Sequence, residues 1–130
     1  MIKAIFFDVD GTLVSFQTHR VSPAVLQALH QLREQGIKLF VSTGRHLQML
    51  SYLRSLFPFD GWITLSGQYC LCGNQVIHRS PMDRRAVAEL VEATRTDAFS
   101  CIYLEGEEIY INYADEHTVS FMKDLDLPLP

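Results

Sequence analysis

Two aspartates near the amino terminus form the densest group of chemically useful residues in the sequence. Asp8 and Asp10 are separated by one residue and are followed by Gly11 and Thr12. In an extended chain, residues two apart point to the same side, so we expect both carboxyl groups on one side of the backbone. Neighbouring carboxylates repel each other and are costly to desolvate, which favours a compensating cation such as Mg²⁺. The bland alternative is an acidic turn, because aspartate and glycine are ordinary turn residues.

The residues before Asp8 predict the strand that positions both aspartates. Residues 2–7 are a nearly unbroken apolar run, which is typical of a strand buried on both faces of a parallel sheet. The aspartates therefore follow the carboxyl end of that strand, and open α/β sheets bind their ligands at this edge.

A second polar loop, Ser42-Thr43-Gly44-Arg45, follows the next predicted strand at residues 37–41. Neighbouring parallel strands bring their carboxyl ends together, so this loop is expected beside the aspartates. It offers a hydroxyl group, a flexible backbone and the start of a helix, all of which favour an anion. Carboxylates, a cation and an anion cradle together are the chemistry of phosphoryl transfer. The Arg45 side chain either contacts substrate or pairs with an acid, and the sequence leaves both open.

Alternating strand and helix patterns predict an α/β fold with a parallel sheet. A helix after Ser22-Pro23 ends near Gly36, a second helix runs from Leu47 to Phe57, and a third strand covers residues 62–65. From residue 68 the pattern changes to α+β, with strands at 68–72, 75–79, 99–104 and 108–113 and helices after Asp83 and at 115–125. We place a boundary near Pro81, which gives a Rossmann-like part at 1–81 and an α+β part at 82–130.

Composition narrows the class of protein. The 130 residues carry a net charge of -4, and this lack of a basic footprint argues against a nucleic-acid partner. The longest apolar runs are too short to span a bilayer, and no secretory signal is visible at Met1. Three cysteines without zinc-type spacing are most simply reduced thiols, so we expect a cytoplasmic protein.

The motif at residues 8–13, Asp-Val-Asp-Gly-Thr-Leu, resembles the first motif of the haloacid dehalogenase (HAD) superfamily of phosphatases. Thr43 matches the second motif, a serine or threonine that ends strand two. The Thr-Gly-Arg at 43–45, the Ser-Gly-Gln-Tyr at 66–69 and the α+β segment resemble the Cof-type branch, subfamily IIB. The resemblance implies a Rossmann-like HAD core followed by the first half of an α+β cap.

The resemblance also implies roles for individual residues. Asp8 would be the nucleophile that forms an aspartyl-phosphate, and Asp10 the acid/base. Thr43 would hydrogen-bond the transferring phosphoryl group, and Mg²⁺ would be held by the Asp8 carboxylate and the Asp10 backbone carbonyl. The candidate substrate-binding residues in the matching loops are Gly11, Thr12, Gly44 and Arg45.

The sequence departs from the family where the third and fourth motifs, a lysine and a later pair of acids, are expected. Lys3 and Lys38 begin predicted strands at the opposite edge of the sheet, and Lys123 lies in the terminal helix. Asp124 and Asp126 follow a helix rather than a buried strand. The chain therefore resembles the amino-terminal half of a longer protein. Without later strands, the strand at 2–7 would have an exposed edge, which predicts self-association.

These observations leave three functional hypotheses. The first is a Mg²⁺-dependent phosphatase of small phosphorylated metabolites, such as sugar phosphates, that acts through an aspartyl-phosphate. The second is a catalytically inactive HAD module that acts in binding or assembly. The third is a receiver-like phosphoacceptor, although receivers lack the D-x-D-G-T motif and the α+β segment. Turnover of an aryl phosphate with and without the Asp8 carboxylate separates the first two.

Overall fold

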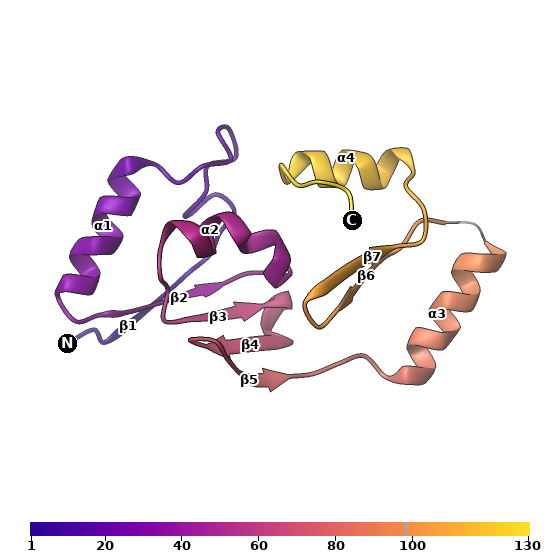
Figure 1. The fold of residues 1–130 in the computed structure, drawn as a ribbon, viewed down its shortest axis with the longest axis horizontal. Coiled ribbons are helices and arrows are strands. Elements are labelled where there is room, and N and C mark those ends of the chain that lie inside the picture. Colours follow the sequence, from indigo (N-terminus) through magenta and orange to yellow (C-terminus); the bar gives the residue numbers. More distant parts are fainter. Residues whose placement is uncertain (98) are drawn as a thin grey trace. The chain divides into compact units, whose positions relative to one another are not determined.

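The computed structural model describes residues 1–97 and 99–130, and the chain divides into two compact units. Unit 1 is Met1–Ser80 and unit 2 is Pro81–Pro130 (Figure 1). The division falls beside Pro81, where the sequence analysis placed a boundary. That the two units are a phosphatase core and part of its cap stays a prediction.

Unit 1 is built on one mixed sheet with the strand order β1-β2-β3-β4-β5 (Figure 1). Parallel pairing joins β1 to β2 and β2 to β3, which confirms the predicted α/β class. The hairpin of β4 and β5 pairs antiparallel with β3 and extends the same sheet. The bounds of the five strands are Ala4–Phe7, Lys38–Ser42, Gly61–Thr64, Tyr69–Cys72 and Gln75–Arg79.

The first predicted helix is found where the sequence places it, whereas the second is divided into two parts. Helix α1, Pro23–Glu34, begins where the Ser22 hydroxyl accepts a hydrogen bond from the Val25 N–H, as predicted. The continuous helix expected from Leu47 to Phe57 is instead a 3₁₀ turn, η1 at Leu47–Leu50, followed by α2 at Ser51–Leu56. That prediction was wrong because Leu50, with φ of -107° and ψ of 10°, leaves the α-helical region.

The expectation that residues 2–7 are buried on both faces was also wrong. The strand exists and is parallel, but the side chains of Ile2 and Phe6 are 67% and 56% exposed. Within the described residues β1 pairs with β2 alone, so it lies at the sheet edge, and the Phe6 ring stacks on Phe40. Thirteen other side chains form the core of unit 1: Val9, Leu13, Val14, Leu29, Leu39, Val41, Leu47, Leu50, Leu53, Phe57, Phe59, Trp62 and Leu71.

Unit 2 contains the helices α3, Arg84–Thr96, and α4, Glu116–Asp124, with the antiparallel strands β6, Ile102–Glu105, and β7, Glu108–Ile111. Both helices begin at the expected positions, because Asp83 and Asp115 cap them with their carboxylates. In the part of the chain that is described, Met122 is the one buried hydrophobic side chain of this unit.

Two expectations from composition can be compared with the structure. Cys70, Cys72 and Cys101 are all free thiols, as the sequence analysis expected. Among residues 1–97 and 99–130, no helix combines the length and the apolar character needed to cross a bilayer.

Candidate active site

The two motif-bearing loops lie at the same edge of the unit 1 sheet. In the parallel register of β1 and β2, Phe7 is opposite Val41, so Asp8 and Ser42 are the first residues beyond that pair. The Thr43 N–H donates to the Ile63 carbonyl at 2.9 Å, which anchors the second loop to β3. The topology therefore brings together the carboxyl ends of three neighbouring strands, as ligand sites of α/β sheets require.

A tight backbone turn follows β1 and carries the acidic motif. The Val14 N–H donates back to the Val9 carbonyl, and the Gly11 N–H donates to the Val14 carbonyl, both at 2.9 Å. Gly11 has a φ of +79°, a left-handed conformation that favours glycine. A Cβ at this position would also meet the Phe16 ring at 2.4 Å. The glycine of the motif is therefore needed to form the turn.

The two aspartates have different surroundings. Asp8 is exposed, and among residues 1–97 and 99–130 its carboxylate has no hydrogen bond or ion pair. The Asp10 carboxylate is held by Arg45, whose Nε donates to Oδ2 at 2.9 Å and whose Nη2 donates to Oδ1 at 2.6 Å. Of the two interactions that the sequence left open for Arg45, this structure contains the pairing with an acid.

The Thr43 hydroxyl is oriented by its own loop. Its oxygen accepts the backbone N–H of Arg45 at 3.1 Å, and its hydrogen is donated to no acceptor among residues 1–97 and 99–130, which leaves it available for a ligand. The Thr43 carbonyl accepts the Ser66 N–H at 3.1 Å, and the residue is buried. Glycine is not sterically required at position 44, because a Cβ there would meet Ser66 Oγ at an ordinary 3.6 Å.

Backbone strain beside Thr43 was not predicted. Leu65 and Ser66 have φ values of 50° and 54°, and two consecutive non-glycine residues in this region are unusual. The Leu65 N–H donates to the Arg45 carbonyl at 3.2 Å. The Ser66-Gly67 pair after the third strand was the one sequence signal of a turn here, and it does not indicate left-handed residues before the glycine.

His46, the residue after Arg45, has a structural role in this loop. Its side chain is buried, and Nδ1 accepts the Gln48 N–H at 3.2 Å, which caps η1. The cap fixes the chain directly after Arg45.

The oxygen donors of the acidic turn fit a hard divalent cation. No residue among 1–97 and 99–130 donates a hydrogen bond to the Asp8 carboxylate or to the Asp10 backbone carbonyl. Mg²⁺ prefers such oxygens and keeps several waters when proteins supply few ligands. The described residues contain no cluster of three or more His, Cys, Asp or Glu side chains that could hold a metal. The donor chemistry of this turn therefore fits Mg²⁺.

Neither lysine of unit 1 lies at this edge of its sheet. Lys3 precedes β1, and Lys38 begins β2, where its Nζ contacts Asp60 Oδ1 at 3.0 Å. Burial raises the pKa of Asp60, but the hydrogen bond from the Leu39 N–H and the nearby Lys38 and Arg33 outweigh it, so this pKa lies below the ordinary 3.8. Lys38 therefore belongs to a structural ion pair at the amino-terminal end of β2.

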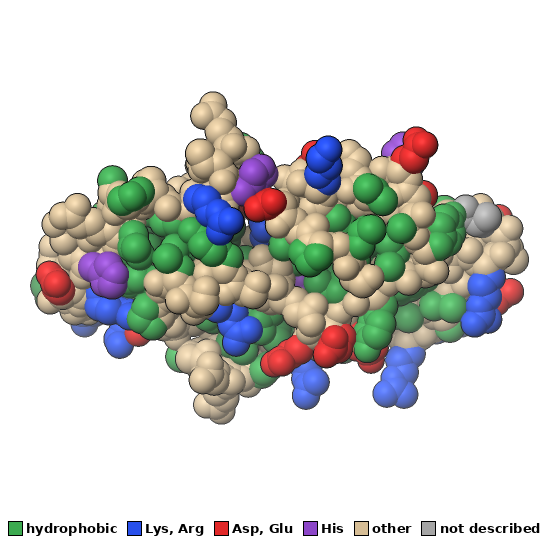
Figure 2. Space-filling model, turned by 45° about the horizontal axis from the view of Figure 1, so that its top comes forward, with side chains coloured by type: hydrophobic (Ala, Val, Ile, Leu, Met, Phe, Trp, Pro, Cys, Tyr) green, Lys and Arg blue, Asp and Glu red, His purple; other side chains and the backbone are tan. Residues whose placement is uncertain are grey.

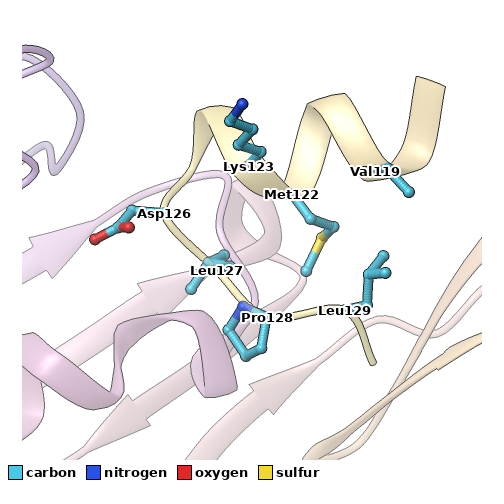
Figure 3. A pocket seen from close by; sticks show the side chains of 7 residues that line it. All are labelled: Val119, Met122, Lys123, Asp126, Leu127, Pro128 and Leu129. Carbon is cyan, nitrogen blue, oxygen red and sulfur yellow. The ribbon is translucent and has the colours of Figure 1, made fainter. Parts of the chain in front are cut away.

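Unit 2 has an open pocket of its own between α4 and the segment that follows it (Figure 3). Its lining is mostly apolar, and it contains none of the predicted site residues, all of which belong to unit 1. The lining residues are Val119, Met122, Lys123, Asp126, Leu127, Pro128 and Leu129.

Comparisons with known proteins agree with the motifs and the fold. A family model of haloacid dehalogenase-like hydrolases matches residues 5–126. The HMP-PP phosphatase of Yersinia enterocolitica is 36% identical over 92 residues, which cover 71% of this chain and 33% of that protein. The chain also resembles the structure of the HAD subclass IIB sugar phosphatase BT4131, with 35% identity and a TM-score of 0.81 over 98% of this chain and 50% of that chain.

A further solved structure, described as showing a trigonal-bipyramidal intermediate in a phosphoryl-transfer superfamily, has 34% identity and a TM-score of 0.87. The alignment covers 99% of this chain and 51% of that one. The chain thus spans between a third and about half of the length of these relatives. Because the family match covers nearly all of its residues, the chain belongs to the haloacid dehalogenase-like hydrolases.

Proposed function

We propose that this chain carries the nucleophile and the acid/base of a Mg²⁺-dependent phosphatase that hydrolyses small phosphorylated metabolites, such as sugar phosphates. One observation carries the proposal: the exposed Asp8, whose carboxylate has no partner among the described residues, shares a sheet edge with the buried Thr43 and the Asp10–Arg45 pair. The likeness to an HMP-PP phosphatase and to a sugar phosphatase supports this reaction class.

The chemistry proceeds in two steps on Asp8. In the first, a carboxylate oxygen of Asp8 attacks phosphorus, the ester P–O bond breaks, and Asp10 donates a proton to the leaving oxygen. In the second, Asp10 takes a proton from water, the water oxygen attacks phosphorus, and the bond to Asp8 breaks to release phosphate. Mg²⁺, held by the Asp8 carboxylate and the Asp10 carbonyl, would offset the repulsion between carboxylate and phosphate.

The remaining predicted residues contribute donors to the phosphoryl oxygens. The Thr43 hydroxyl can take this role because its oxygen accepts the Arg45 N–H while its hydrogen has no acceptor in the described part of the chain. The N–H groups of Gly11 and Thr12 donate within the turn, to Val14 and Val9, so we assign these two residues a shaping role. The Gly44 N–H has no acceptor among residues 1–97 and 99–130, and we propose that it donates to the substrate.

The alternative is a catalytically inactive module that acts in binding or assembly. The placement of Lys3 and Lys38 favours it for this chain, because neither lysine reaches the edge where Asp8 lies. A phosphatase site without the lysine ammonium of the third motif beside the developing charge would be weak. The chain on its own is therefore expected to turn over far more slowly than a site with that charge.

Turnover of an aryl phosphate in the presence of Mg²⁺ tests the proposal. Asp8→Asn should abolish turnover because the amide is a poor nucleophile, and mass spectrometry should detect a phosphoryl adduct only when Asp8 is present. Asp124→Asn is the matched control, since it makes the same change at an exposed position of unit 2. Equal turnover by the wild-type chain and Asp8→Asn would refute the assignment, and no adduct with no turnover would favour the inactive module.

A further inference from the structure

The Asp10–Arg45 pair has the geometry of a fork rather than of a simple ion pair. Two different nitrogens of the guanidinium, Nε and Nη2, each donate to a different oxygen of the Asp10 carboxylate. The Arg45 side chain is only 11% exposed, whereas that of Asp10 is 32% exposed. Two parallel hydrogen bonds fix the plane of the carboxylate as well as its position.

The backbone of Arg45 is held on both sides of the residue. Its N–H donates to Thr43 Oγ1 at 3.1 Å, and its carbonyl accepts the Leu65 N–H at 3.2 Å. The next residue, His46, is 1% exposed and caps η1 through Nδ1. The guanidinium therefore extends from an anchored base, so it can hold Asp10 in a fixed orientation.

We infer that Arg45 is a positioning residue that orients the Asp10 carboxylate, and that it is not a ligand of the substrate. This inference rests on the proposed function, in which Asp10 transfers a proton at a defined place. Proton transfer requires the donor and acceptor atoms to lie within hydrogen-bond reach, and a misplacement of about 1 Å can lower a rate by about 10²-fold. Lysine cannot replace arginine here because its ammonium group cannot form the same fork.

The first arm of the test observes the fork directly, without any need for activity. In the ¹H–¹⁵N spectrum of the labelled chain, the Arg45 Nε–H should give a signal protected from exchange, identified by its loss in Arg45→Lys. Asp10→Asn should shift this signal and remove its protection, because an amide does not offer two anionic oxygens to the fork. Asp8→Asn removes a charge two residues from Asp10, at a side chain that does not contact Arg45, and should leave the Arg45 Nε–H signal unchanged. An unprotected wild-type signal, or an equal response to both variants, would overturn the inference.

The second arm separates positioning from substrate binding. Arg45→Lys should lower kcat for an aryl phosphate by roughly 10- to 100-fold while KM stays within about 2-fold. A raised KM with an unchanged kcat would instead make Arg45 a substrate ligand and overturn the inference. Thermal unfolding of Arg45→Lys checks that the variant folds. If wild type and Asp8→Asn turn over equally, the proposed function fails, while the spectra still decide whether Arg45 holds Asp10.

Discussion

The two units of this chain reach their structures by different means. Unit 1 contains thirteen buried hydrophobic side chains, whereas Met122 is the one buried hydrophobic side chain among the described residues of unit 2. Hydrophobic side chains are visible on the molecular surface between the charged ones (Figure 2). Those of unit 2 that are largely exposed include Met82, Leu104, Tyr110, Phe121 and Leu129.

In unit 2, local hydrogen bonds cap both ends of helix α4. Helix α4 begins with a reciprocal capping box, in which Asp115 Oδ1 accepts the Thr118 N–H at 2.8 Å and Thr118 Oγ1 accepts the Asp115 N–H at 2.9 Å. It ends in a Schellman motif, with the Asp126 N–H bonded to Lys123 and the Leu127 N–H to Met122. The ends of a helix can therefore be defined by local hydrogen bonds in a unit that has only a small core.

The largest expected effect is a loss of stability in unit 1 when a side chain is removed from its core. Leu39→Ala removes a fully buried side chain from β2 and should lower the free energy of unfolding of unit 1 by about 3–5 kcal/mol. Leu104→Ala is the matched change on β6, where the side chain is 41% exposed, and should lower the stability of unit 2 by less than about 1 kcal/mol. Native-state hydrogen exchange measures the free energy of unfolding of both units in one sample. Similar losses of stability in the two units would contradict the contrast between a large and a small core.

Self-association tests the exposed edge of unit 1. The strand β1 has a neighbour on one side only in the described residues, and Lys3 is the one charged residue at positions 2–7. Because such edges pair readily with other chains, we expect the free chain to associate, as measured by light scattering. Phe6→Lys should suppress association, whereas Val76→Lys on the other edge strand, β5, should not. A monomeric wild-type chain at high concentration would contradict this prediction.

A smaller effect concerns pH and the cap of α4. The hydrogen bond from the Thr118 N–H, helped by the Ser100 and Thr118 hydroxyls, lowers the pKa of Asp115 from 3.8 to about 2. Because the folded-state value is the lower one, the stabilisation is present above about pH 4 and is lost as the pH falls toward 2. Asp115→Ala should fray α4 at neutral pH and remove this pH dependence, as measured by hydrogen exchange at the amides of α4. An unchanged pH profile would show that the cap does not stabilise the helix.

The smallest expected effect is a gain in stability. Asp126 occupies the left-handed position that ends α4, with a φ of 54°, where glycine is the preferred residue. Asp126→Gly should therefore stabilise unit 2 by up to about 1 kcal/mol in hydrogen exchange. Asp124→Gly, at the last residue of α4, relieves no left-handed strain and should not stabilise unit 2. Destabilisation by both changes would show that the Asp126 side chain has a structural role.

The sequence alone predicts most of the helices and strands and the end of the sheet at which the candidate site lies. The helix starts can be predicted from N-cap residues, whose side chains accept hydrogen bonds from N–H groups two or three residues further on: Ser22, Asp83 and Asp115. The two motif loops were expected together because strands joined by short helical crossovers pair in parallel. All of these signals act over a few residues or follow from chain connectivity, so they can be recognised without coordinates.

Tertiary structure alone decided how the site residues pair. Asp10 and Arg45 are 35 positions apart, and only the β1–β2 register brings the guanidinium to the carboxylate. Likewise, the left-handed Ser66 donates its N–H to the carbonyl of the distant Thr43, and the exposure of Phe6 depends on which strands flank β1. A local pattern cannot encode such outcomes, because each is set by groups distant in sequence that compete for the same space and the same hydrogen bonds.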